Sequence, residues 1–247
     1  MKILAIESSA LVASACVYED GVIKAQSSTN FKKTHSQTLM PMVEQVVKMT
    51  ETDLKSLDAI AVCGGPGSFT GLRIGSATAK GLGLALDKPL IHVPTLDAMA
   101  YNFYGSADLI VPIMDARRDQ VYAGLYTFKE KEGHGSSLCV LKESFAMDMD
   151  SLLDLIYKEY FSGEKEGIFK KAVFLGDGVP AFKKAIEEKA CFDFIFASPN
   201  LAFQSSAALA GLAAEYYKAG KIIDADLEKP DYLRPSQAER VRAEREG

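Results

Sequence analysis

Short apolar runs alternate with helical patterns through the first 105 residues of the chain. A short apolar run is typical of a buried strand, whereas apolar positions that recur every three to four residues indicate a helix. The segment Glu19-Asp20-Gly21 separates two such runs and predicts a hairpin turn. The predicted strands are 2–7, 11–18, 22–27, 57–63 and 90–93, and the predicted helices are 36–50, 69–86 and 95–104. This order is typical of a mixed sheet of the ribonuclease-H type.

The second half of the chain repeats that order. In each half a strand ends in a carboxylate, Glu7 or Asp115, and a later strand meets a glycine turn, at Gly64 or Gly176. The predicted strands are 109–115, 120–128, 138–140, 143–147 and 172–175, the predicted helices are 151–160, 179–189 and 205–219, and 130–137 is an exposed loop. Because internal repeats set the fold, we predict an α/β protein of two lobes. They comprise residues 1–105 and residues 106–247, the second including the C-terminal helix and a mobile tail at 237–247.

Composition narrows the range of functions. The chain is 48% hydrophobic and 25% charged, with a net charge of −5, so it lacks the basic excess with which a protein grips nucleic acid by itself. Its N-terminal apolar run is too short for a signal peptide, and no membrane partner is expected. The four cysteines are far apart, which predicts reduced thiols and a cytoplasmic protein. With three histidines and no paired cysteines, the ordinary zinc signatures are absent.

One predicted helix, 69–86, carries small residues at four-residue intervals, at Gly71, Gly75, Ala79 and Gly83. Residues four apart share a helix face, and each interior glycine costs about 1 kcal/mol relative to alanine. A bare face at that cost indicates that another backbone comes very close. Two neighbours are compatible with the pattern: the sheet of the same lobe, or a helix of a partner protein.

The glycine turn before that helix does not carry a known catalytic motif. No Walker A spacing fits, because Arg73 lies a turn too late for the lysine of that motif. Ser68 directly follows Gly67 and therefore does not fit the nucleophile elbow of hydrolases.

Acidic and basic residues at the strand ends form a second candidate site. Glu7 and Asp115 each end a strand that faces a predicted cleft, where they could hold a metal-bound phosphate or act as a base. Arg117 and Arg118 follow directly and could clamp a phosphate or a carboxylate, although at most one of them is expected to point into a site. The alternative is structural: the carboxylates cap turns and pair with these arginines.

Several segments resemble the TsaB family of accessory subunits in bacterial tRNA threonylcarbamoyladenosine synthesis. The segments are Ile6-Glu-Ser-Ser9, His35-Ser-Gln-Thr-Leu-Met-Pro41, Gly65-Pro-Gly-Ser-Phe-Thr-Gly-Leu-Arg-Ile-Gly75, Ala79-Lys-Gly81, Asp115-Ala-Arg-Arg-Asp-Gln-Val-Tyr122, Gly176-Asp-Gly178 and Tyr232-Leu-Arg234. The resemblance implies a two-lobed, actin-like (ASKHA) fold of tandem ribonuclease-H-like lobes with mixed sheets. It also implies a TsaD-like catalytic partner, which transfers the threonylcarbamoyl group to an adenosine of tRNA, and a TsaE-like ATPase. The metal-binding His-Met-Glu-Gly-His of TsaD corresponds here to Thr95-Leu-Asp-Ala-Met99, so the resemblance implies no metal site and no catalytic residues.

We therefore expect a non-catalytic scaffold and activator of a TsaD-like subunit, which meets tRNA only indirectly. The resemblance assigns the two helices 36–50 and 69–86 to the partner interface, with the contact residues Leu39, Val43, Val46, Gly71, Gly75, Ala79 and Gly83. Gly75→Leu is accordingly expected to abolish partner binding and to leave the monomer folded. The free chain is expected to form a homodimer through the same surface.

No cofactor is expected to bind this chain alone, although ATP or ADP is expected near the partner interface. The residues expected near such a nucleotide are Glu7, Arg73, Asp115, Arg117 and Arg118. Two enzymatic alternatives stay open: an ATP-dependent phosphotransferase of the ASKHA superfamily, and a metallopeptidase-like enzyme.

Overall fold

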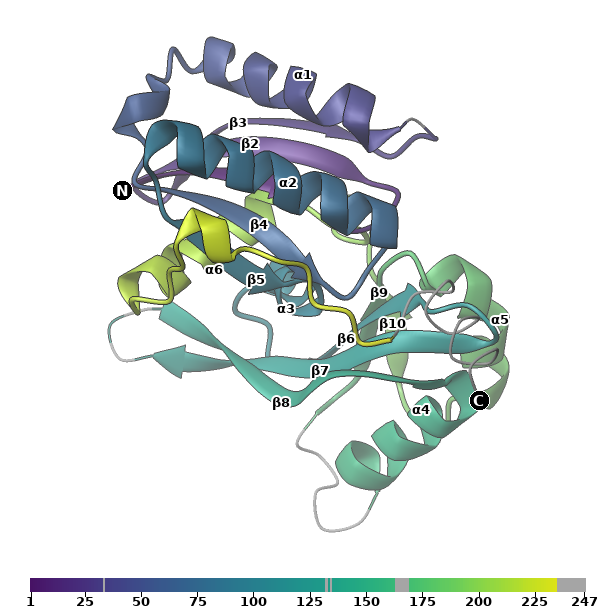
Figure 1. Ribbon diagram of the computed structural model, residues 1–247. Coiled ribbons are helices and arrows are strands. Elements are labelled where there is room, and N and C mark those ends of the chain that lie inside the picture. Colours follow the sequence, from purple (N-terminus) through teal and green to yellow (C-terminus); the bar gives the residue numbers. More distant parts are fainter. Residues whose placement is uncertain (33, 132, 134, 163–168, 235–247) are drawn as a thin grey trace.

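The computed structural model describes residues 1–234 except 33, 132, 134 and 163–168. Two five-stranded sheets form the framework of two lobes (Figure 1). The first sheet has the strand order β3-β2-β1-β4-β5, in which β1 to β3 pair antiparallel and β4 and β5 add in parallel. Its strands are β1 (Lys2–Glu7), β2 (Ala13–Glu19), β3 (Val22–Thr29), β4 (Ala59–Gly65) and β5 (Leu90–Pro94). This is the mixed sheet that the pattern predicts.

The second sheet repeats the first. Its order is β10-β9-β6-β7-β8, so β6, β7, β8, β9 and β10 take the places of β1 to β5. Its strands are β6 (Leu109–Asp115), β7 (Gln120–Lys131), β8 (Gly135–Asp148), β9 (Ala172–Leu175) and β10 (Phe194–Phe196). The two predicted strands at 138–140 and 143–147 are in fact parts of β8, which also takes up the end of the predicted loop at 130–137. The repeat predicted from the sequence is confirmed.

Helices cover both faces of the first sheet (Figure 1). Because successive strand residues point to opposite faces, Leu4 and Ile6 pack with helices α1 and α2 on one face. Ile3 and Ala5 pack with helix α6 on the other face. The bounds are α1 (His35–Met49), α2 (Phe69–Leu86), α3 (Thr95–Ala100), α4 (Met149–Ile156), α5 (Val179–Lys189) and α6 (Ser206–Lys218), with short turns η1 (Leu54–Ser56), η2 (Tyr101–Phe103), η3 (Tyr157–Phe161) and η5 (Ala225–Leu227).

The position of α6 corrects the predicted lobe assignment. Leu209, Leu212 and Ala213 of α6 are buried against the first sheet, although the sequence places this helix after the whole second lobe. The core of the first lobe is therefore completed by α6, which follows the second lobe in the sequence. The predicted tail at 237–247 lies outside the described residues.

The second sheet uses its two faces differently. Leu109, Val111 and Ile113 of β6 pack with helices α4 and α5. Ile110 and Met114, which point the other way, pack with α3 and line the junction of the lobes. Helix α3 thus lies between the sheets, and no helix in the described part of the chain is both long and apolar enough to cross a membrane.

The small-residue column of α2 packs against its own lobe, which corrects its assignment to a partner interface. A Cβ on Gly71 would lie 2.1 Å from the carbonyl oxygen of Ser8, and one on Gly75 would lie 2.4 Å from the Ser8 hydroxyl. A Cβ on Gly83 would meet Ala225 and Leu90, and Ala79 is fully buried. The close backbone that the column predicts is therefore the chain's own.

The predicted contact residues of α1 are also internal. Leu39, Val43 and Val46 are buried in the core between α1 and the first sheet. They follow the helical spacing that the sequence shows, but that spacing marks the face toward the sheet. They cannot fill the grooves of a partner helix while the lobe is folded.

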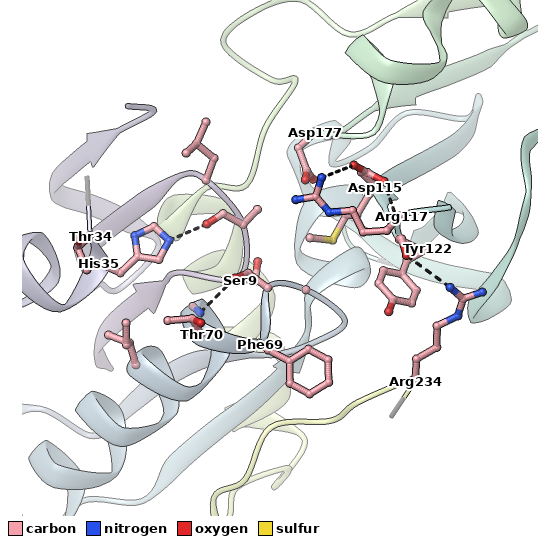
Figure 2. A pocket seen from close by; sticks show the side chains of 18 of the residues that line it. Ser9, Thr34, His35, Phe69, Thr70, Asp115, Arg117, Tyr122, Asp177 and Arg234 are labelled. Atoms are coloured by element: carbon pink, nitrogen blue, oxygen red, sulfur yellow. Dashed lines mark hydrogen bonds and ion pairs between the residues drawn. The ribbon is translucent and has the colours of Figure 1, made fainter. Parts of the chain in front are cut away.

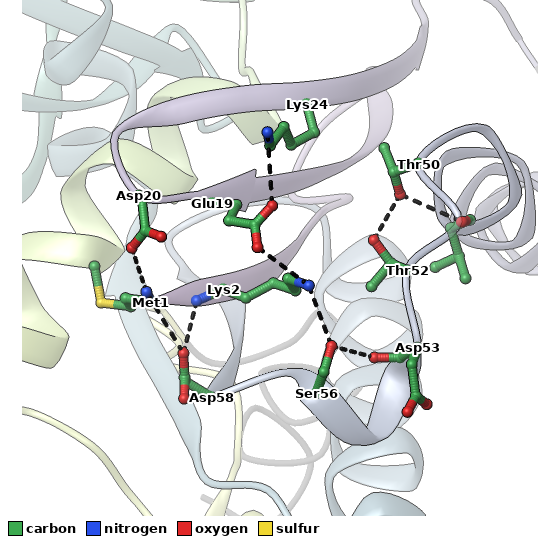
Figure 3. Close-up of polar contacts among 11 residues, drawn as sticks. Met1, Lys2, Glu19, Asp20, Lys24, Thr50, Thr52, Asp53, Ser56 and Asp58 are labelled. Carbon is green, nitrogen blue, oxygen red and sulfur yellow. Dashed lines mark hydrogen bonds and ion pairs between the residues drawn. The ribbon is translucent and has the colours of Figure 1, made fainter.

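Polar contacts gather at the start of β1, at the end of the sheet away from the lobe junction (Figure 3). The Lys2 amide donates to Asp58 (2.7 Å), and its ammonium group contacts Glu19 (3.2 Å) and Ser56 (3.2 Å). Exposed ion pairs of this kind contribute roughly 0–1 kcal/mol each. The core, rather than this network, holds the sheet together.

Candidate functional site

A cavity of about 770 Å³ lies between the two lobes (Figure 2). The first lobe contributes the turn after β1 and the N-terminal end of α2, and the second lobe contributes the turn after β6. Its lining is Ser9, Ala10, Leu11, Thr34, His35, Gly67, Ser68, Phe69, Thr70, Gly71, Ile74, Met114, Asp115, Ala116, Arg117, Arg118, Tyr122, Asp177 and Arg234. Of the residues predicted near a nucleotide, Asp115, Arg117 and Arg118 reach it.

The backbone groups of the glycine turn on the first-lobe wall form hydrogen bonds within the chain. The Ser68 amide donates to the carbonyl of Ser9 (2.7 Å), and the Ser68 side chain caps α2 by accepting from the Gly71 amide (3.3 Å). The Ser8 hydroxyl donates to the carbonyl of Gly71 (2.9 Å), and a Cβ on Gly67 would lie 2.3 Å from the Ser9 carbonyl oxygen. The Ser68 amide, one of the backbone donors with which such a turn could hold a phosphate, is thus engaged by Ser9, and the Gly71 amide is engaged by the Ser68 side chain.

Glu7 is buried beneath this wall. Its side chain is 1% exposed and does not line the cavity. Its Oε1 accepts from the amide and the hydroxyl of Ser9 (2.6 Å each), and its Oε2 has no hydrogen-bond partner among the described residues. Burial raises the pKa of this carboxyl, while the hydrogen bonds from Cys63 and Ser9 oppose the rise. The expectation that Glu7 lies beside a nucleotide is not met in this arrangement.

The second-lobe wall is a strained turn. Arg117, Arg118 and Asp119 have φ angles of 64°, 55° and 56°, and a left-handed conformation costs about 1–2 kcal/mol for each residue with a side chain. The carboxylate of Asp115 supports the turn, because it accepts from the Arg117 amide (2.7 Å) and pairs with the Arg117 guanidinium (3.3 Å). Both arginines line the cavity, whereas the sequence analysis expects at most one there. The pairing of Arg117 with Asp115 is the structural role foreseen as the alternative.

Asp177, between Gly176 and Gly178, lies beside this turn (Figure 2). It accepts a hydrogen bond from the Gln204 side-chain amide (3.0 Å). Burial raises the pKa of its carboxyl, and the nearby charge of Asp115 adds to the rise. Two carboxylates and three arginines thus share the cavity, so its charge is mixed rather than concentrated for a polyphosphate.

The structure moves one predicted residue away from the cavity and brings to it two that were not predicted there. Arg73 does not line the cavity, and its Nε donates to the hydroxyl of Tyr232 (3.0 Å) on the outside of α2. Arg234 reaches the cavity from near the end of the described chain, and its guanidinium contacts the carbonyl of Ala116 (3.4 Å). Tyr122 lines the cavity from β7. Tyr232-Leu-Arg234 stands out in the sequence, but nothing there shows where it lies.

The described side chains offer no metal centre in this cavity or elsewhere: no three His, Cys, Asp or Glu residues in that part of the chain come close enough to hold an ion. Thr95, Asp97 and Met99 are instead buried in α3.

Comparison with known proteins places this arrangement in a family. The model of the family TsaD, tRNA N6-adenosine threonylcarbamoyltransferase, matches residues 24–241. The chain belongs to this family. Its curated relatives include the tRNA threonylcarbamoyladenosine biosynthesis protein TsaB of Bacillus subtilis (strain 168), which is 40% identical over 129 residues, or 52% of this chain and 56% of the relative. TsaB of Escherichia coli (strain K12) is 36% identical over 128 residues, or 51% and 55% of the two chains.

These matches confirm the resemblance to TsaB that the sequence motifs indicate. The aligned part of the chain spans only about half the length of these curated relatives. A solved structure named YeaZ from Pseudomonas aeruginosa covers 94% of this chain and 99% of its own, with a TM-score of 0.72 and 24% identity. At that identity the likeness shows the fold, and with the repeated sheets it confirms the two-lobed, actin-like architecture of this TsaD-family chain.

Proposed function

We propose that this chain is a non-catalytic subunit that binds a TsaD-like transferase and keeps it active in tRNA threonylcarbamoyladenosine modification. The family match over residues 24–241 supports this proposal, as do the names of the TsaB relatives. The proposed setting is the cytoplasm, with a TsaE-like ATPase as a further partner and tRNA reached only through the transferase. The net charge of −5 agrees with an indirect contact to tRNA.

The proposed interface with the transferase is the outer surface of α1 and α2. The two helices cover the face of the first sheet that points away from the second lobe (Figure 1). The exposed side chains of the two helices include Met40, Met49 and Leu84, which are 46%, 69% and 58% exposed. Methionine is enriched at protein interfaces relative to the rest of the surface. We propose these exposed residues as contacts with the partner, in place of the buried column and the buried residues of α1.

The non-catalytic part of the proposal rests on the packing around the cavity. Glu7, one of the two carboxylates that a phosphotransferase would place beside its nucleotide, is buried and bonded to Ser9. The other, Asp115, lines the cavity but is engaged by Arg117. The lobes are also tied together, because the Asp97 carboxylate of α3 accepts from Tyr126 of β7 (2.8 Å) and Tyr216 of α6 (3.2 Å). A fixed pair of lobes suits a scaffold better than an enzyme that closes over its substrate. A nucleotide at the partner interface and a homodimer of the free chain remain parts of the proposal.

Binding of the TsaD-like protein of the same organism tests the interface. Met40→Glu and Leu84→Glu each place a charge on the proposed surface, and we expect each to weaken binding by about 30-fold, the effect of losing a contact worth about 2 kcal/mol. Ile195→Glu is the matched control, since Ile195 is similarly exposed on β10 of the second lobe. Calorimetry measures the affinities, and circular dichroism checks that each variant is folded.

Two results would contradict the proposal. Unchanged affinity of both folded first-lobe variants would remove the α1–α2 surface from the interface. ATP turnover by the purified chain alone, lost on Glu7→Gln, would favour the phosphotransferase instead. Size measurement of the free chain, with and without ADP, tests the homodimer.

A further inference from the structure

After α6 the chain crosses the surface of the first lobe as a strap, residues 221–234 (Figure 1). We call this segment the C-terminal strap. Ile223 exchanges two backbone hydrogen bonds with Leu90 of β5 (2.9 Å each), and the Asp231 amide donates to the carbonyl of Gly64 (2.7 Å). The strap thus adds backbone contacts along β5 and the end of β4.

The two glycines that end β4 have close neighbours: the strap lies on Gly65, and His92 of β5 lies on Gly64. A Cβ on Gly65 would lie 2.3 Å from the carbonyl oxygen of Asp231, and Gly65 has a φ of 132°, which residues with side chains rarely adopt. A Cβ on Gly64 would lie 1.8 Å from Nε2 of His92. The missing side chains therefore give His92 and the strap their places, and they need no ligand to explain them.

His92 joins the strap to the sheet through both of its ring nitrogens. Nδ1 lies 3.0 Å from Oε2 of Glu228, and Nε2 lies 3.0 Å from Oδ2 of Asp231. A carboxylate only accepts hydrogen bonds, and a neutral imidazole has a single N–H. Both contacts can therefore form together with ionised carboxylates only when His92 is the doubly protonated imidazolium.

The two carboxylates differ in their dependence on that charge. The side chain of Glu228 is 0% exposed and that of Asp231 is 68% exposed. A buried carboxylate that loses its cation is strongly destabilised, whereas an exposed pair contributes little. The buried pair of His92 with Glu228 is thus the one that holds the strap.

The far end of the strap reaches the wall of the cavity. The ring of Tyr232 stacks on Phe69 at the start of α2, with centroids 4.4 Å apart and planes 6° apart. Arg73 donates to the Tyr232 hydroxyl, and Arg234 reaches Ala116 of the second lobe. Both Phe69 and Arg234 line the cavity, so movement of the strap changes its wall.

We propose that the C-terminal strap is a proton-dependent cover: a charged His92 holds it on the first lobe, and it detaches with Tyr232 and Arg234 when His92 loses its proton. This proposal concerns the isolated chain and does not rest on the proposed function. The charged groups that face His92 are Glu228 and Asp231, both from the strap, while Gly64 of β4 presents no side chain to it.

The direction of the pH dependence follows from the contacts. Burial lowers the pKa of His92, but the hydrogen bonds and charges of Glu228 and Asp231 outweigh it and the net shift is upward. A histidine with a higher pKa in the closed state stabilises that state fully at low pH. It loses this stabilisation as the pH rises through the closed-state value. The strap is thus closed in mild acid and opens with rising pH.

A single tryptophan in the full chain reports on the strap. The chain has no tryptophan, so Tyr232→Trp places the only indole against Phe69. We expect its emission to shift to longer wavelength between about pH 6 and about pH 9, with a midpoint above the ordinary histidine value of about 6.5. Hydrogen exchange at the Asp231 and Ile223 amides, corrected for intrinsic rates, is expected to accelerate by up to about tenfold per pH unit between the ordinary histidine value of about 6.5 and the midpoint, and to level off above the midpoint.

Variants of His92 and of its carboxylate partner test the proposal. In the Tyr232→Trp background, His92→Gln is expected to show the open-state emission at every pH, while His35→Gln, which lies away from the strap, keeps the titration. If His92→Gln does not fold, Glu228→Gln serves instead and is expected to lower the midpoint. Emission and exchange that do not depend on pH in the parent, or a titration that persists unchanged in folded His92→Gln or Glu228→Gln, would overturn the proposal.

Discussion

Two carboxylates at equivalent strand ends have opposite surroundings. The sequence correctly places Glu7 and Asp115 at the ends of β1 and β6, because a buried strand that stops at an acid is visible in one dimension. It does not show that residues 8 and 9 fold back over Glu7, or that the turn after Asp115 stays open to the cavity. Arg234 could not be found for the same reason, since its contact with Ala116 spans more than a hundred residues.

Glu7→Gln tests the sealed carboxyl. Because burial raises the pKa of Glu7 in the folded state, its effect on stability is most favourable below the unfolded-state pKa and worsens as pH rises through the folded-state value. We expect Glu7→Gln to raise the free energy of unfolding at about pH 7 by about 1 kcal/mol, since an unpartnered buried amide costs less than an unpartnered buried charge. Below about pH 4 the difference from the parent is expected to vanish.

Urea denaturation at several pH values measures this effect. Glu44→Gln is the control, because Glu44 is exposed and the hydrogen bond from Lys48 lowers its pKa. Its substitution is expected to act with the opposite sign, lowering stability only at pH values above the ordinary glutamate pKa. A Glu7→Gln variant that is less stable than the parent at neutral pH would contradict the expected cost of the buried charge.

At the scale of elements, the hydrophobic pattern predicts that a helix or strand exists, and which of the two it is, better than it predicts what that element packs against. The runs before and after the glycine turn predict β4 and α2 well, and the small-residue column shows that one face of α2 is bare. The spacing is the same whether that face meets its own sheet or another protein, so the sequence leaves the neighbour open. Strand β10 has three residues, too few for a periodicity, and it is absent from the sequence prediction.

Alanine substitutions on two faces of α2 separate these cases. A Cβ on Gly71 would lie 2.1 Å from a backbone carbonyl, whereas one on Gly81 meets nothing within 4 Å. We expect Gly71→Ala to destabilise the isolated chain by about 1–3 kcal/mol through overpacking. The matched Gly81→Ala is expected to stabilise it by about 0.5–1 kcal/mol through helix propensity.

Thermal unfolding of the two variants provides the measurement. Equal effects of the two substitutions would contradict the packing of the column. The same geometry changes the expectation for Gly75→Leu, because a side chain there would meet Ser8 and Val62. We now expect that variant to lose its fold rather than its partner alone.

At the scale of the molecule, the first lobe is built from both ends of the chain. The repeat is visible in the sequence because each half carries its own order of strands and helices. The return of α6 and the strap to the first sheet is not visible there, since an apolar helix face fits any sheet that lacks a cover. The first sheet needs a cover on its second face, because β1 and β4 are buried on both faces. Helices α1 and α2 cover only one of these faces.

Two matched cavity variants test which lobe α6 supports. Leu209 of α6 and Ile186 of α5 are both fully buried, the first in the core of the first sheet and the second in that of the second sheet. Each substitution by alanine is expected to cost about 2–5 kcal/mol. Leu209→Ala is expected to speed hydrogen exchange in β1 and β2, and Ile186→Ala in β6 and β9, because local opening follows the packed unit. Faster exchange of β6 and β9 in Leu209→Ala, with β1 and β2 unchanged, would return α6 to the second lobe.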